Sequence, residues 1–196
     1  MAPNFHSFSK CQRAVVLFVL LAAGSVRFAS AAVIPVGSGC TLAQAITAAN
    51  TDSACGGATG NGADTLVLSG DVSLLSVDNL TDGPNGLPSI TSEILIEGGG
   101  AVIERSSTLA CPQTPTFRLF HVASTGDLTL RDVILRSGCL DESSIVAGGG
   151  IYVDGGDLSV VGSTLQGNAI RYVGVSAGSS GGAIYNLGGN VSLADS

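Results

Sequence analysis

The sequence has few of the groups that most often carry chemistry. Only one of its two histidines, His121, lies beyond the first thirty residues, and no lysine does. No two cysteines have the CxxC spacing of a structural zinc site, and no glycine-rich stretch ends in the Gly-Lys-Ser/Thr of a phosphate-binding loop. We therefore assign no catalytic residue, cofactor or metal ligand from the sequence, and expect His121 to be an ordinary strand histidine.

The sequence also lacks an apolar run long enough to cross a membrane. The run at 14–24 has eleven residues, whereas a transmembrane helix needs about 20. Lys10 and Arg13 precede the run and Ala29-Ser30-Ala31 follows it, which is the order of a secretory signal peptide. We expect residues 1–31 to be cleaved, and the mature protein to be secreted or at the cell surface without a membrane span.

Positive charge is scarce in the rest of the chain. Residues 32–196 contain five arginines against fifteen acidic residues, a net charge of −10. Nucleic acids and anionic lipid surfaces require a basic face. We therefore expect no nucleic-acid partner.

Four cysteines remain after residue 31, and an even number in an exported chain indicates two disulfides. Four cysteines allow three pairings, among which the sequence does not decide. We favour Cys40 with Cys55 and Cys111 with Cys139, because each pair brackets one local segment and closes the shorter loop.

One segment has the pattern of an amphipathic helix. Thr41 followed by Gln44 forms a capping-box pattern, and apolar residues recur at helical spacing from Leu42 to Ala49. We predict a short helix within 38–50, in an N-terminal cap at 32–63 that also holds the first disulfide loop.

From Asp64 onward the pattern changes to short apolar runs with alternating character, separated by Gly, Ser, Asn and Asp. Such runs are too short for helices and are typical of β-strands. The predicted strands lie at 65–68, 94–96, 117–122, 128–130, 133–135 and 158–160. We expect residues 64–196 to be all-β.

An internal repeat distinguishes between all-β architectures. Gly148-Gly-Gly-Ile-Tyr152 recurs as Gly181-Gly-Ala-Ile-Tyr185, and 156–163 recurs as 189–196, both with an offset of 33 residues. Fixed spacing is typical of a solenoid, whereas a β-sandwich gives no reason for the same short sequence motifs to recur. Because the last copy ends at Ser196 without a closing cap, we expect the coils of 64–196 to be truncated at the C-terminus.

The repeat also predicts which residues lie above one another. Asp132, Gly162 and Asp195 occupy the same corner of successive units. Tyr152 and Tyr185 share a position as well, so we expect them to stack on one face. We consider them candidates to face a ligand, with ordinary strand packing as the alternative.

The segments Cys40-Thr-Leu-Ala-Gln-Ala-Ile46 and Ala49-Asn50 resemble the N-terminal lid of bacterial exported right-handed parallel β-helix repeat proteins, which reads Cys-Ser-Leu-Arg-Glu-Ala-Ile followed by Ala-Asn. Gly181-Gly-Ala-Ile184 is also similar to the repeat of chlamydial polymorphic outer-membrane proteins. The second motif of those proteins, Phe-x-x-Asn, is not matched in full, because the corresponding residues here are Leu165-Gln-Gly-Asn168. The resemblance implies a right-handed, single-stranded parallel β-helix with a short N-terminal capping helix.

The function we expect is an adhesin-like, non-enzymatic scaffold whose loops at 140–147 and 169–180 contact glycans or molecules of a host or cell surface. The alternative is a carbohydrate-active enzyme, a polysaccharide lyase or glycoside hydrolase, on the same fold. A hydrolase would need two neighbouring acids, for which the loop residues are Asp141 with Glu142 and Asp154 with Asp157. A structural spacer is a third class.

Overall fold

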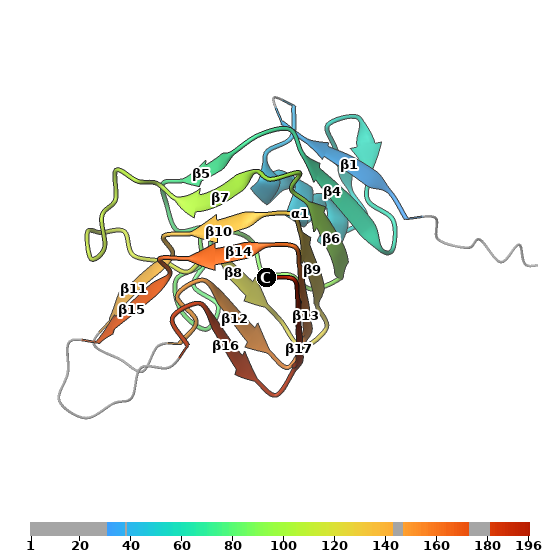
Figure 1. The fold of residues 1–196 in the computed structure, drawn as a ribbon. Coiled ribbons are helices and arrows are strands. Elements are labelled where there is room, and N and C mark those ends of the chain that lie inside the picture. Colours follow the sequence, from blue (N-terminus) through green and yellow to red (C-terminus); the bar gives the residue numbers. More distant parts are fainter. Residues whose placement is uncertain (1–30, 38, 143–146, 173–180) are drawn as a thin grey trace, which may run out of the picture.

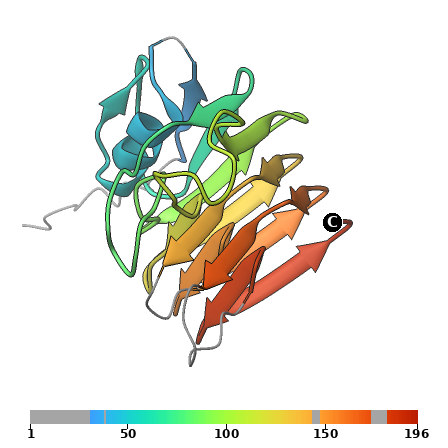
Figure 2. The ribbon, with the colours of Figure 1, turned by 90° about the vertical axis from the view of Figure 1, so that its left-hand side faces the viewer.

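Short parallel strands, stacked turn upon turn, make up most of the molecule. The computed structural model describes residues 31–37, 39–142, 147–172 and 181–196, so the predicted signal peptide lies outside the described residues except for Ala31. Strands of successive turns lie beside one another in Figures 1 and 2. The predicted right-handed parallel β-helix is confirmed.

The longest wall of the helix is a parallel sheet of six strands. In spatial order they are β1 (Val33–Val36), β4 (Asp64–Leu68), β6 (Glu93–Glu97), β9 (Asp127–Arg131), β13 (Asp157–Val161) and β17 (Asn190–Ala194). The register aligns one aliphatic residue from every strand: Ile34, Leu66, Ile96, Leu130, Val160 and Leu193. The first five are buried in the core, whereas Leu193, in the last strand of the sheet, is 60% exposed. Strand β1, which the sequence pattern had placed in the cap, therefore belongs to this wall.

The other walls of the helix contain fewer strands, and each of these strands has three or four residues. A sheet of four strands contains β5 (Val72–Leu74), β7 (Val102–Arg105), β10 (Ile134–Arg136) and β14 (Thr164–Gln166). A sheet of three contains β8 (Phe120–Val122), β12 (Ile151–Asp154) and β16 (Ile184–Leu187). A sheet of two contains β11 (Cys139–Glu142) and β15 (Ala169–Tyr172).

Two sequence predictions about these walls need correction. The segments expected to be partner-binding loops, 140–147 and 169–180, begin with the paired strands β11 and β15. Their remaining parts include 143–146 and 173–180, which lie outside the described residues. The strand predicted over 117–122 is regular only from Phe120, since Phe117 and Arg118 form isolated bridges instead.

One corner repeats with the same backbone conformation. Asp132, Gly162 and Asp195 have φ angles of 51°, 57° and 55°, as the shared corner position predicted. These positive values lie in the left-handed region, which glycine and aspartate adopt more readily than most residues. The sharp turn between the six-stranded and four-stranded walls therefore restricts the residue type at this corner.

The N-terminal cap covers the first turn. Helix α1 (Leu42–Asn50) has the predicted capping box, and its inward face is buried against the solenoid. The Asn50 side chain donates to the main-chain oxygen of Ser89 at 2.7 Å and accepts from the Thr91 amide at 2.9 Å, which fastens the helix to the coils. Within the described ranges, no helix is long and apolar enough to span a bilayer.

The favoured disulfide pairing is confirmed. Cys40 is bonded to Cys55 in the antiparallel hairpin of β2 (Ala54–Cys55) and β3 (Ala58–Thr59). Cys111 is bonded to Cys139 at the start of β11. Two disulfides in one small domain indicate an oxidising compartment.

Candidate functional site

Three ring side chains form a column on the outer face of the β8–β12–β16 sheet. The strand register places Tyr152 between His121 and Tyr185. The ring centres are 5.7 Å apart for His121 and Tyr152 and 5.5 Å apart for the two tyrosines, with interplanar angles of 17° and 21°. The predicted tyrosine stack is therefore confirmed, and the histidine is an additional member.

This stacking limits how the column can contact a ligand. Tyr152 has a ring against each of its faces, so a sugar cannot stack on it as it would on an isolated aromatic ring. The tyrosines can offer a ligand only their edges and hydroxyl groups, apart from the outer face of Tyr185. Hydrogen bonding to hydroxyl-bearing molecules is the interaction that such edges provide.

The Arg118 side chain lies beneath this face and is fully buried. Its Cζ is 4.7 Å from the centre of the Tyr152 ring, and Nη2 donates to the main-chain oxygen of Asp82 at 2.8 Å. Burial lowers the pKa of Arg118 to about 10, against the opposing effects of Tyr152 and Asp82, so the guanidinium stays charged at neutral pH. Nε and Nη1 have no hydrogen-bond partner among the described residues.

A bulge explains why Arg118 and His121 share a face although they are three residues apart. The amides of Leu119 and Phe120 both donate to the main-chain oxygen of Gly150, each at 3.0 Å. Leu119 and Phe120 thus oppose a single residue, Gly150, and the side chains of Leu119 and Phe120 both point into the core. In a regular strand, with its period of two, Arg118 and His121 would lie on opposite faces.

The loop that carries Asp82 passes over the guanidinium. Asn85, which is buried, fixes this loop by donating to Asn79 Oδ1 and to the main-chain oxygen of Thr81, both at 2.8 Å. Gly83 has a φ of 112°, and a Cβ atom there would lie 2.8 Å from Arg118 Nη2. Glycine at this position therefore allows the loop to lie directly on the arginine.

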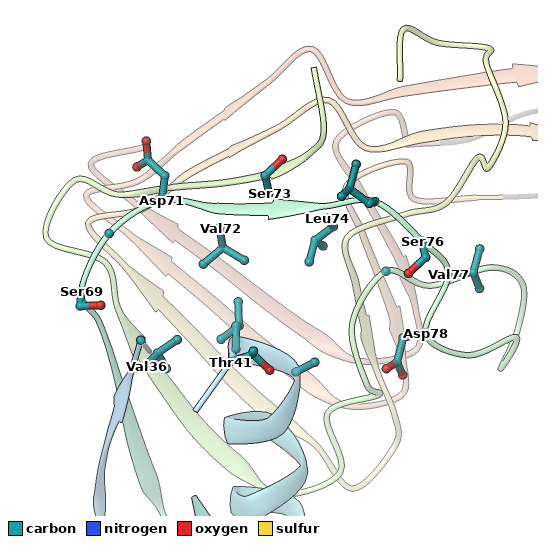
Figure 3. A pocket seen from close by; sticks show the side chains of 16 residues that line it. Val36, Thr41, Ser69, Asp71, Val72, Ser73, Leu74, Ser76, Val77 and Asp78 are labelled. Carbon is teal, nitrogen blue, oxygen red and sulfur yellow. The ribbon is translucent and has the colours of Figure 1, made fainter. Parts of the chain in front are cut away.

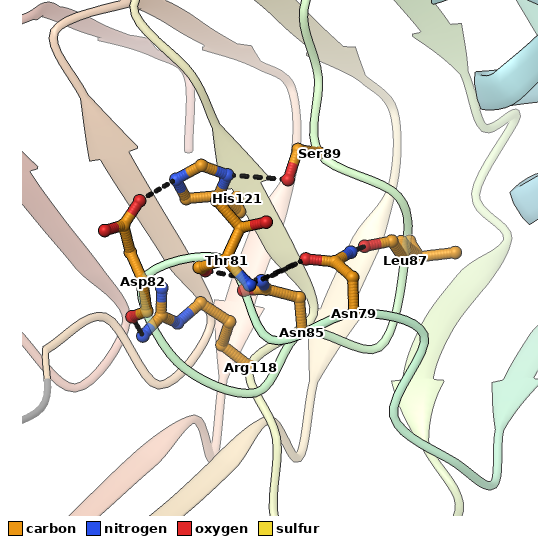
Figure 4. Close-up of polar contacts among 8 residues, drawn as sticks. All are labelled: Asn79, Thr81, Asp82, Asn85, Leu87, Ser89, Arg118 and His121. Atoms are coloured by element: carbon orange, nitrogen blue, oxygen red, sulfur yellow. Dashed lines mark hydrogen bonds and ion pairs between the residues drawn. The ribbon is translucent and has the colours of Figure 1, made fainter.

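His121 is held from two sides (Figure 4). Its Nδ1 lies 2.8 Å from Ser89 Oγ, and its Nε2 lies 3.2 Å from Asp82 Oδ2. The second distance is that of an ion pair, but the contact is not aligned as a hydrogen bond. Burial lowers the pKa of His121. Asp82 opposes this shift through its charge and through its direct contact with the imidazole, Arg118 adds to the lowering, and Asp154 opposes it. The imidazole is therefore neutral at pH 7.

Asp154 completes the cluster. It follows Tyr152 by two residues in β12 and so lies on the same outer face. One carboxylate oxygen each from Asp82 and Asp154 and one ring nitrogen of His121 all lie within 4.8 Å of one another. Alternation within β12 could have placed Asp154 beside Tyr152, but neither the Asp82 loop nor the bulge before His121 has a signal in the sequence.

The structure places the two acids that the sequence suggested as a pair in different strands. Asp154 belongs to the His121 cluster, whereas Asp157 begins β13, where its carboxylate accepts from Asn190 Nδ2 at 2.7 Å. Asp157 also raises the pKa of its neighbour Asp127, although burial is the larger cause. For the other suggested pair, Asp141 lies in β11, and the Glu142 side chain is outside the described part of the chain.

A cavity in the described part of the chain lies elsewhere. It has a volume of about 670 Å³ and opens between β1, the start of α1 and β5 (Figure 3). Its walls are mostly aliphatic and small side chains, and Asp71, at its rim, already accepts from the Val102 amide at 2.9 Å. The stacked rings and the three-residue cluster of Asp82, His121 and Asp154 lie around His121 rather than here.

Comparisons with protein-family models, with curated proteins and with solved structures found no match. The relationship to exported β-helix repeat proteins therefore stays a prediction. The geometry around His121 is the basis for the functional proposal.

Proposed function

We propose that the protein is an exported, adhesin-like β-helix that binds glycans on the outer face of β8, β12 and β16. The predicted signal peptide and the two disulfides support a secreted or cell-surface location. The solenoid is the scaffold, and its outer face presents polar groups at the spacing of stacked strands, about 4.8 Å.

The observation that carries this proposal is the column of Tyr152 and Tyr185 beside the carboxylate of Asp154. Both tyrosines are partly exposed and offer hydroxyl groups that donate and accept hydrogen bonds. Asp82 and Asp154 add acceptors for sugar hydroxyls on the same face. An edge of this composition suits a ligand that is rich in hydroxyl groups and has little apolar surface.

Charge narrows the class of glycan. Residues 32–196 have a net charge of −10, and both carboxylates of the site add negative charge locally. Acidic polysaccharides would be repelled by this field. We therefore expect neutral or amino-sugar polymers to bind more tightly than uronic-acid polymers.

Contacts within the protein also hold the site in place, which favours recognition. Asn85 and the buried Arg118 hold the Asp82 loop, and neighbouring turns hold the ring column. A ligand that binds a preformed face loses less free energy in ordering the protein.

A glycan-array screen followed by calorimetry on the best ligand tests the proposal. Tyr152→Phe combined with Tyr185→Phe keeps the ring stack and removes both hydroxyls, so we expect affinity to fall about tenfold or more, at about 1 kcal/mol for each lost hydrogen bond. Leu193→Ala is the matched control, because it removes a side chain that is 60% exposed on another wall. Absence of glycan binding, or equal affinity in the tyrosine variant, would contradict the proposal.

One observation supports glycoside hydrolysis as a second candidate. Asp82 and Asp154 offer carboxylate oxygens within 4.8 Å of each other, close to the separation of about 5–5.5 Å between the two carboxyl groups of retaining glycosidases. Incubation with neutral polysaccharides and an assay for released reducing ends decides between the two candidates. Release that disappears in Asp154→Asn would favour the enzyme, whereas binding without release would favour the adhesin.

A further inference from the structure

The Nε2 atom of His121 has an unusual position for a buried polar atom. The histidine is 1% exposed, and Nε2 forms no hydrogen bond with any described residue. The atom nevertheless faces two carboxylates, those of Asp82 and Asp154. Leaving a buried nitrogen without a partner costs about 1–3 kcal/mol, so its position beside two acids calls for an explanation.

The contact between Nδ1 and Ser89 indicates what kind of atom could lie between Nε2 and the two carboxylates. If Nδ1 donates its proton to Ser89 Oγ at 2.8 Å, Nε2 carries a lone pair that points toward the carboxylates. A lone pair and a carboxylate repel each other unless a cation lies between them. Metal-binding histidines usually donate a hydrogen bond from the ring nitrogen that does not bind the metal, which here is Nδ1.

The distance between the two nearest groups fits a shared ion. Asp82 Oδ2 lies 3.2 Å from His121 Nε2 but off the line of an N–H hydrogen bond. Two ligand atoms at about 2.1 Å from one metal ion and 3.2 Å from each other subtend an angle of about 100° at the ion. This angle lies between the tetrahedral and octahedral values, whereas an aligned hydrogen bond would require a different approach.

We propose that Asp82, His121 and Asp154 bind one divalent transition-metal ion of the zinc class, with the remaining coordination positions open to water or to a ligand hydroxyl. Imidazole with carboxylates is a ligand set for Zn²⁺ and its neighbours, whereas Ca²⁺ and Mg²⁺ take oxygen ligands. Asp154 is half-buried at the end of β12 and directly precedes glycines, so its side chain can move the short distance needed to coordinate.

The neighbouring Arg118 is compatible with this site because, among the described residues, its guanidinium forms no hydrogen bond with a carboxylate of the cluster: Nη2 donates to a main-chain oxygen, and Nε and Nη1 have no partner. It contacts the Tyr152 ring and the main-chain oxygen of Asp82, not a carboxylate oxygen of the cluster. The two aspartates outnumber this single positive charge. The metal site shares a face with the proposed glycan site but does not depend on glycan binding.

Calorimetric titration of the metal-stripped full chain, without a polyhistidine tag, tests the site with Zn²⁺ alone. We expect one ion per chain, with affinity at least tenfold weaker in Asp82→Asn and in Asp154→Asn. Asp157→Asn is the matched control, because it removes a carboxylate three residues from Asp154 that lies outside the cluster. Ca²⁺ in place of Zn²⁺ should give no comparable heat.

Two further features keep the result interpretable. His6 and the cysteines are unchanged in every variant, so binding of Zn²⁺ by those residues would persist and would not produce the expected difference. Asp82 and Asp154 are both at least partly exposed, so their asparagine variants should keep the wild-type circular dichroism spectrum. No stoichiometric binding by the wild type, or equal binding by Asp154→Asn, would overturn the proposal and leave the glycan proposal standing.

Discussion

Arg118 lies against the ring of Tyr152, with its Cζ 4.7 Å from the ring centre, although the two residues belong to different turns. This contact joins the buried layer of the site to its exposed layer. The same guanidinium binds the main chain of Asp82, so one side chain positions both the loop and the ring column. The first prediction concerns what happens when its charge is removed.

Arg118→Met should leave global stability within about 1 kcal/mol of wild type. The change removes a cation–π contact and a hydrogen bond, but it also removes two buried nitrogens without partners. The Asp82 side chain is 47% exposed, so its carboxylate stays hydrated and the substitution leaves no buried charge without a partner. Urea denaturation measures the change, with Arg118→Ala, which leaves a cavity and should cost several kcal/mol, as the comparison.

The same substitution should have a local effect that the global measurement misses. Without the guanidinium, the loop at 79–85 keeps its backbone hydrogen bonds to the Arg118 main chain but loses the side-chain bond at Asp82. Amide exchange at Gly83 should therefore accelerate more than exchange in the β9 and β13 strands. Unchanged exchange at Gly83 would show that the Asn85 side chain and the backbone hydrogen bonds hold the loop without the guanidinium.

The ring column predicts that its middle member matters most for stability. Tyr152→Ala removes two ring stacks and the Arg118 contact, whereas Tyr185→Ala removes one stack. At about 0.5–1.5 kcal/mol for each aromatic pair, the first change should cost about twice as much as the second or more. Chemical denaturation of both variants checks this, and equal costs would indicate that the rings pack independently.

The fold could be predicted from the sequence because it repeats. The 33-residue offset placed Tyr152 over Tyr185, and the corner residues Asp132, Gly162 and Asp195 took the same backbone conformation. Each of these features depends on period and residue type, which a single sequence displays directly. The disulfide pairing followed from loop length for the same reason, since the nearest cysteines along the chain also meet in space.

The site could be predicted only in part because it departs from the repeat. Tyr152 was identified, but Asp82 reaches the site from an irregular loop whose path depends on Gly83 and Asn85. His121 faces outward beside Arg118 only because a bulge changes the alternation of β8. Both features follow from tertiary hydrogen bonds, which leave no period in the sequence.

Asp127 should make stability depend on pH. Burial and the neighbouring Asp157 raise its pKa in the folded state, so the folded protein binds this proton more tightly than the unfolded chain does. Stability from this group is therefore highest below the unfolded pKa of about 3.9 and falls as the pH rises through the folded value. At pH 7 the full penalty is present.

Asp127→Asn should remove this penalty. The new amide could also donate to Asp157 from below, as Asn190 does from above at 2.7 Å. We expect a gain of a few tenths of a kcal/mol to about 1 kcal/mol at pH 7, with a smaller gain at pH 3. Thermal melts at both pH values measure it, and a gain that grew on acidification would contradict this explanation.

Gly162 offers a test of the repeated corner. Its φ of 57° is accessible to asparagine, and a Cβ atom added there would lie 2.6 Å from Asp132 Oδ1, an exposed side-chain atom that can rotate away. Gly162→Asn should therefore be tolerated or should stabilise the protein by up to about 1 kcal/mol, because asparagine restricts the unfolded chain and can bond to Asp132. Gly162→Val, which cannot adopt this conformation without strain, should destabilise the protein by more than 1 kcal/mol. Equal melting temperatures for the two variants would mean that the corner relaxes and that its backbone conformation does not restrict the sequence.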